Sequence, residues 1–62
     1  MTDLHEQDLR KQIDDLEKRA AESALIAGLA TDPEARLYNT NLARELGDAA
    51  ARLRKRLLQS AA

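Results

Sequence analysis

The fold is decided by residues 28–34, GLATDPE, at the middle of this 62-residue chain. Glycine tolerates the left-handed conformation that closes many helices, so Gly28 is expected to end one helix. Asp32 is expected to cap a second helix, because its carboxylate can accept free backbone N–H groups and the following proline disfavours helical angles. Pro33 then takes the first helical position, where its missing N–H costs nothing. A competing frame makes Thr31 the cap, with Glu34 closing a capping box.

Apolar residues recur at helical spacing on both sides of this turn. The expected stripes are Leu9, Ile13, Leu16, Ala20, Ala24 and Ala27, then Ala35, Tyr38, Leu42, Leu46, Ala49, Leu53 and Leu57. Both stripes repeat every eleven residues, which favours nearly straight helices. Strands are disfavoured because the chain has twelve Ala, eleven Leu and no Val. The sequence therefore predicts one all-α domain, an antiparallel two-helix hairpin over residues 1–62, with helices at about 3–28 and 33–59 and a turn at 29–32.

The two stripes can be aligned into facing layers around a single centre. The predicted pairs are Leu9 with Leu53, Ile13 with Ala49, Leu16 with Leu46, Ala20 with Leu42, Ala24 with Tyr38, and Ala27 with Ala35. The centre of this register is Thr31, which lies inside the turn chosen from glycine and proline. Gly47 falls within the second helix and is expected to be a close-contact position, at a cost of about 1 kcal/mol.

Charge is divided unevenly along the chain, although the formal total is only −1. Residues 1–34 hold nine acids against four bases, a net of −5, and residues 35–62 hold six bases against two acids, a net of +4. Oppositely charged ends of two antiparallel helices would give this pattern, with Asp3, Glu6 and Asp8 near the basic residues at positions 52–56. A basic arm for nucleic acid is the alternative interpretation.

A chain this short is not expected to be stable alone. Ordering it costs roughly 1.5 kcal/mol per residue, and so small a core barely offsets that sum. It has no cysteine and one histidine, so disulfides and a structural metal are not expected and a partner chain is. The hypothesis is a homodimer that forms a four-helix bundle, with a larger protein as another possible partner. The predicted interface comprises Ala21, Leu25, Ile26, Gly28, Leu29, Leu37, Ala43, Ala50 and Leu57.

The sequence offers little for catalysis, so we expect neither an enzyme nor a cofactor or metal. His5 is expected to be a surface residue, and Ser23 and Ser60 have no plausible His–acid system beside them. No apolar run approaches the ~20 residues of a membrane span, and no signal peptide is evident, so a cytoplasmic location is expected. The predicted function is a non-catalytic interaction or oligomerisation module. The alternative is a nucleic-acid-binding regulator that uses Arg52, Arg54, Lys55 and Arg56.

The layout of two long helices joined at the midpoint of a roughly sixty-residue chain resembles the Rop family of plasmid-copy-number proteins. That resemblance implies a dimeric four-helix bundle that binds paired RNA loops, and it carries no individual RNA-contacting position over to this chain. Residues 30–36, ATDPEAR, followed by residues 42–46, LAREL, resemble a turn and helix of small uncharacterised alphaproteobacterial proteins. This second resemblance implies no function.

Overall fold

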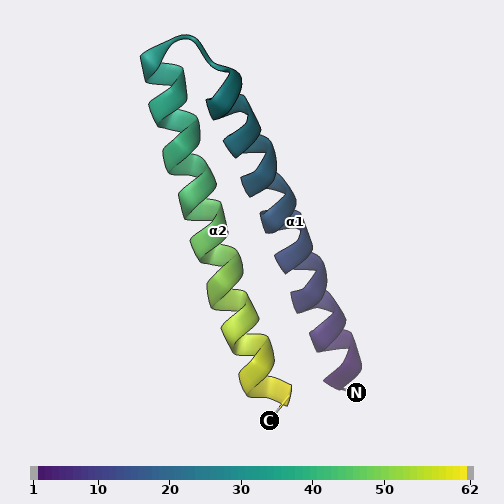
Figure 1. The fold of residues 1–62 in the computed structure, drawn as a ribbon. Helices are drawn as coiled ribbons and strands as arrows, with labels where there is room; N and C mark the ends of the chain where they lie inside the picture. Colours follow the sequence, from purple (N-terminus) through teal and green to yellow (C-terminus); the bar gives the residue numbers. More distant parts are fainter. Residues whose placement is uncertain (1, 62) are drawn as a thin grey trace.

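The computed structural model describes residues 2–61, with side chains described for residues 5–60. Helix α1 runs from Thr2 to Leu29 and helix α2 from Pro33 to Ala61. The helices pack side by side in opposite directions, so both chain ends lie at the same end of the rod (Figure 1). The rod measures 48 × 15 × 11 Å. The predicted all-α hairpin is confirmed, and residues 2–61 contain no strand.

Asp32 caps helix α2, as predicted from the aspartate–proline pair. Its Oδ2 accepts a hydrogen bond from the backbone N–H of Ala35 at 3.1 Å. Its backbone carbonyl accepts one from the N–H of Arg36 at 3.0 Å. The free N–H of Ala35 in the first turn is thereby satisfied, and Pro33, which has no N–H, occupies the first helical position. The frame with Thr31 as the cap is not adopted.

The end of helix α1 differs from the prediction that Gly28 stops it in a left-handed conformation. The helix continues through Gly28 to Leu29, and among residues 2–61 no glycine has a positive φ. The N–H of Ala30 still donates to the carbonyl of Ile26 at 2.9 Å. Arg36 then reaches back from α2, and its Nη2 donates to the carbonyl of Ala30 at 2.9 Å. Because a side chain of the next helix satisfies this carbonyl, the turn closes without a left-handed glycine.

The buried seam of α1 follows a seven-residue repeat instead of the predicted eleven. Its buried and half-buried members are Leu9, Ile13, Leu16, Ala20, Ser23 and Ala27. Ala24 lies off the seam and is exposed, whereas Ser23 is buried against α2. The predicted seam position of Ala24 is therefore wrong, and Ser23 takes its place.

The seam of α2 contains Ala35, Asn39, Leu42, Leu46, Ala50, Leu53 and Leu57, with Ala49 half-buried beside it. The spacing from Asn39 to Ala50 is the eleven-residue repeat expected for this helix. Tyr38 is 66% exposed, so its predicted place in the core is wrong. Asn39 occupies that turn of the seam, and its Nδ2 donates to the carbonyl of Ala35 at 2.9 Å.

Candidate interaction surface

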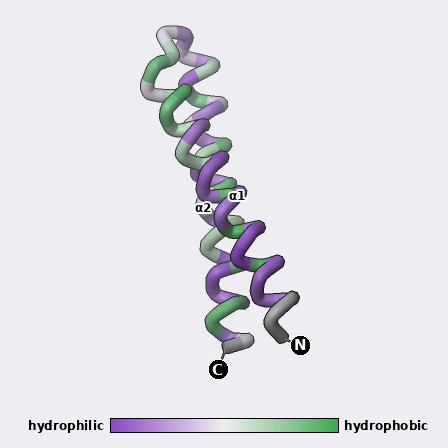
Figure 2. Tube along the Cα trace, turned by 90° about the vertical axis from the view of Figure 1, so that its right-hand side faces the viewer, coloured by the Kyte–Doolittle hydropathy of each residue, from purple (hydrophilic) through white to green (hydrophobic). Residues whose placement is uncertain are grey.

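Five large apolar side chains lie exposed around the turn end of the rod. We call them the turn-end cluster: Leu25, Ile26, Leu29, Leu37 and Tyr38. Each is at least 51% exposed, and the most exposed, Leu29, is 74%. Leu58, near the opposite end, is the sixth exposed large apolar residue among the described side chains. In the hydropathy-coloured view, apolar segments accompany both helices close to the turn (Figure 2).

The interior of the hairpin at this same end is small and polar. Ser23 is a buried seam residue, and Asn39 is half-buried. Ala27 is buried and Ala35 half-buried, so no residue larger than Asn39 lies in this stretch of the seam. At the other end, Leu9 and Ile13 are 5% and 3% exposed. Apart from Leu58, the large apolar side chains described at the open end are buried or half-buried, whereas those of the turn-end cluster are exposed.

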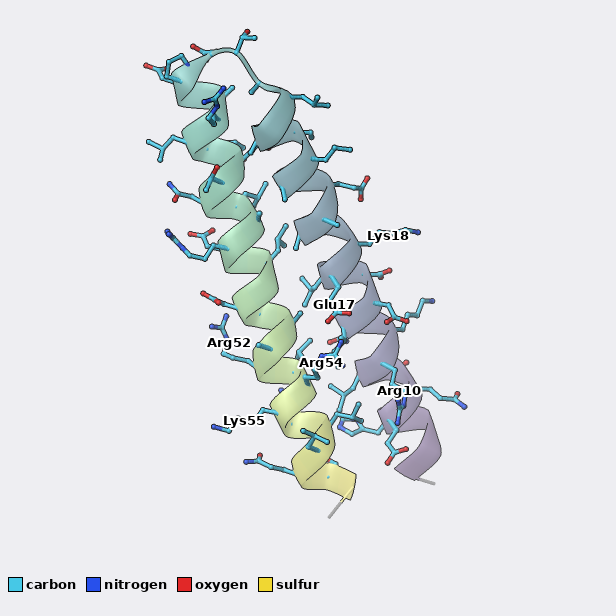
Figure 3. The ribbon with its side chains drawn as sticks, in the orientation of Figure 1. Arg10, Glu17, Lys18, Arg52, Arg54 and Lys55 are labelled. Atoms are coloured by element: carbon cyan, nitrogen blue, oxygen red, sulfur yellow. The ribbon has the colours of Figure 1, made fainter. Side chains whose placement is uncertain are left out.

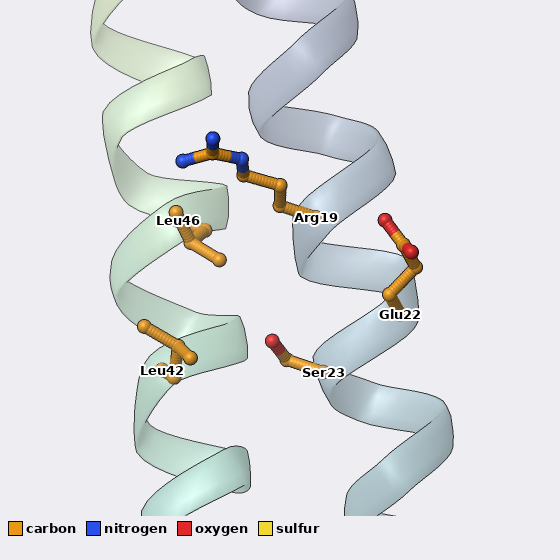
Figure 4. Close-up of a pocket in the computed structure, with 5 residues that line it drawn as sticks. All are labelled: Arg19, Glu22, Ser23, Leu42 and Leu46. Carbon is orange, nitrogen blue, oxygen red and sulfur yellow. The ribbon is translucent and has the colours of Figure 1, made fainter.

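A shallow hollow opens beside Ser23, between the two helices (Figure 4). Leu42 and Leu46 form its α2 side, and the Ser23 side chain points towards them from α1. Arg19 lines both this hollow and its neighbour along α1, which Gln12, Asp15 and Leu16 complete. These hollows expose the half-buried leucines of the seam without enclosing a ligand-sized cavity.

The small residues and Leu57 of the predicted interface differ in how exposed they are. Ala21 and Gly28 are exposed on α1, and Ala43 and Leu57 are half-buried on α2. Ala50 is only 2% exposed because it packs in the seam, so its side chain is not available to a second hairpin.

Gly47 continues helix α2, as predicted, and it makes no close contact within the hairpin, so the predicted close contact is not one between α1 and α2. Apart from its chain neighbours and the nearby backbone of its own helix, a Cβ placed there would meet no described atom within 4 Å, and the same is true of Gly28. The backbone at both glycines faces open space.

One basic residue near the end of α2, Arg54, is bound to a side chain of α1. Arg54 forms a hydrogen-bonded ion pair with Glu17, the one ion pair among the described side chains (Figure 3). Glu17 raises the pKa of Arg54, first through the hydrogen bond and then through its negative charge. The charge of Asp14 raises this pKa further, and desolvation lowers it. The acids predicted to lie near Arg54 are closer to the start of α1 than Glu17 is. Glu6 and Asp8 form no ion pair with the basic end of α2, and the side chain of Asp3 lies outside the described residues.

The position of this ion pair has a geometric reason. Side chains on a helix lean towards its N-terminus, so in an antiparallel pair the side chains of α1 and α2 lean in opposite directions. Arg54 leans towards the turn and Glu17 towards the open end, and they meet although their backbones lie at different heights (Figure 3).

The other basic residues at this end stay free of α1. Arg52, Lys55 and Arg56 are exposed, and Arg52 and Lys55 project away from α1 (Figure 3). The structure therefore separates Arg54 from the other three members of the predicted nucleic-acid set.

Residues suited to chemistry are not gathered into a site. His5 is exposed, Ser60 is exposed near the C-terminal end, and Ser23 is buried in the seam. Within the described part of the chain, no three His, Cys, Asp or Glu side chains come close enough together to hold a metal ion. Neither described helix has a stretch long and apolar enough to span a membrane.

The fold defines the chain as a two-helix antiparallel hairpin, and this layout agrees with the Rop-like arrangement noted from the sequence. Comparison with models of known protein families gives no match, and comparisons with curated proteins and with solved structures give no significant match.

Proposed function

We propose that this chain is a non-catalytic interaction module that associates with a second copy of itself. The observation that carries the proposal is the turn-end cluster, which leaves five large apolar side chains in water on a 62-residue protein. Exposed large apolar side chains gathered at one end of a protein are characteristic of sites that another protein covers.

The exposed area supports the same proposal. The hairpin exposes 5012 Å² of surface. A compact monomer of 6.9 kDa exposes about 4,000 Å², so the rod has an excess of roughly 1,000 Å². A standard protein–protein interface removes about 800 Å² from each partner. One such interface would therefore bring the exposed area per chain close to that of a compact protein.

The mass in solution tests this proposal. Sedimentation equilibrium at micromolar concentration is expected to give a dimer, and the melting temperature is expected to rise with protein concentration. The double variant Leu25→Gln, Leu29→Gln is expected to shift the mass towards the monomer while retaining helicity, because neither leucine is in the seam. Leu58→Gln is the matched control at the other end of the rod, with a smaller expected effect. A folded, cooperative monomer of the wild-type chain would refute the proposal.

A nucleic-acid-binding role is the second candidate, because Arg52, Lys55 and Arg56 are exposed and unpaired among the described side chains. Binding to duplex DNA and to structured RNA would be measured across a salt titration, since phosphate contacts weaken steeply with salt. Lys55→Glu with Arg56→Glu is expected to abolish such binding. Binding that is insensitive to both changes would exclude this role for the basic end.

A further inference from the structure

We infer that two copies of this hairpin associate with their turns at the same end, so that each α1 lies beside the α2 of the other copy. This inference rests on the proposed self-association and adds the orientation of the second copy. It is carried by the charge of the two helices and by the one-sided position of the turn-end cluster.

Symmetry limits the choice to two arrangements. Two rods packed face to face about a two-fold axis can have that axis along the rod or across it. With the axis along the rod, the turns meet at one end and each α1 lies beside an α2. With the axis across the rod and in the plane of the hairpin, the turns lie at opposite ends, α1 lies beside α1, and α2 lies beside α2. Neighbouring helices are antiparallel in both cases, so the helix dipoles do not distinguish them.

The charges of the helices distinguish the two arrangements. Helix α1 has seven acids and four bases, a net of −3, and helix α2 has three acids and six bases, a net of +3. Packed helices lie 8–10 Å apart, which is within about one Debye length at 0.1 M salt, so these charges are only partly screened. When the turns lie at the same end, helices of opposite net charge lie side by side across the interface. When the turns lie at different ends, helices of the same net charge lie side by side.

The free bases of α2 make this complementarity specific. Arg52 and Arg56 are exposed near the open end and are not held by α1 of their own chain. Arg54 and Leu57 lie beside Arg10, Ile13 and Asp14 within the hairpin. With the turns together, Arg52 and Arg56 therefore lie at the height of the first half of the second copy's α1, which contains Asp8, Asp14 and Asp15. With the turns apart, they lie beside the second copy's α2, at the height of its turn end.

The apolar groups point to the same orientation. Five of the six exposed large apolar side chains described lie at the turn end. When the turns meet, the cluster of one copy lies at the height of the cluster of the other, and apolar surface can be buried against apolar surface. When the turns are apart, each cluster lies at the height of the other copy's charged open end.

Distances between spin labels test the orientation directly, because the chain has no cysteine of its own. Thr31→Cys puts a label in the exposed turn, and Ser60→Cys puts one near the open end. In the turn-to-turn dimer, the Thr31→Cys pair and the Ser60→Cys pair are both expected to give short distances. These distances correspond to the 15 and 11 Å widths of the rod plus the reach of the labels. A mixed sample of the two variants is expected to show a long distance close to the 48 Å rod length.

Each contrary result has a different meaning. Long distances within each variant and a short one in the mixed sample would overturn the orientation while supporting self-association. A short Thr31→Cys distance with a Ser60→Cys distance well beyond 48 Å would show contact between the turn ends alone and would also overturn it. The absence of any dipolar coupling, together with a monomeric mass, would refute the proposed function itself.

Discussion

Replacing Asp32 with alanine removes the side-chain cap that starts α2. The carboxylate accepts a hydrogen bond from the N–H of Ala35 at 3.1 Å, and alanine leaves that donor to water. Loss of an aspartate cap typically costs about 1 kcal/mol, within a range of roughly 0.5–2 kcal/mol. For a domain of this size, 1 kcal/mol corresponds to a fall in melting temperature of about 4–8 °C.

The assay is thermal unfolding followed by circular dichroism at one fixed protein concentration, since association would shift the midpoint. Thr31→Ala is the matched control, because Thr31 is the rejected cap and is expected to change the melting temperature little. Asp32→Asn keeps a competent cap and loses only the favourable charge at the helix start, about 0.3–1 kcal/mol. A fall for Thr31→Ala as large as that for Asp32→Ala would refute the assignment of the cap.

Three further changes probe the helices. Ile13→Ala removes a side chain that is 3% exposed and is expected to lower the free energy of unfolding by about 2–5 kcal/mol, measured by urea denaturation. Gly47→Ala is expected to raise it by about 0.5–1 kcal/mol, because the added Cβ meets open space in a helical backbone; destabilisation would show that another chain packs there. Glu17 raises the pKa of Arg54 above its ordinary value. The positive charge of Arg54 therefore stabilises the folded state at every pH below that ordinary value, and the contribution is lost only as the pH rises through the raised pKa. The difference in melting temperature between the wild type and Arg54→Gln should therefore stay constant from neutral pH to about pH 12, and a step in that interval would contradict it.

The hairpin and its turn were predictable because local chemistry determines them. Asp32 and Pro33 specify a helix start through one side-chain acceptor and one fixed dihedral angle, and neither depends on distant residues. The end of α1 was not predictable in the same way. The carbonyl of Ala30, directly after α1, accepts a hydrogen bond from Arg36, and the reach of that side chain depends on how the two helices are placed.

The seam could be predicted only where its residues are apolar. Choosing the apolar member of each adjacent pair selected Ala24 over Ser23 and Tyr38 over Asn39, and both choices are wrong. A two-helix packing has a single narrow seam, so the rotation of the helix decides which residue faces inward, whatever its polarity. The ion pair of Arg54 was missed for a similar reason, since matching backbone heights ignores the opposite tilt of the two sets of side chains.

The two misplacements that exchange a polar and an apolar residue, at positions 23–24 and 38–39, are informative because both lie towards the turn; the third, Ala50 in the seam where Ala49 was predicted, exchanges two alanines. At that end, hydrophobicity and helix geometry disagree: geometry turns serine and asparagine inward and leaves leucine, isoleucine and tyrosine in water. At the open end they agree, and Leu9 and Ile13 are buried. A chain that stabilised itself only through its own seam would gain free energy by exchanging these polar and apolar positions near the turn. That the chain keeps the opposite pattern is the physical ground for proposing a second copy at the turn end, where the hairpin alone buries least.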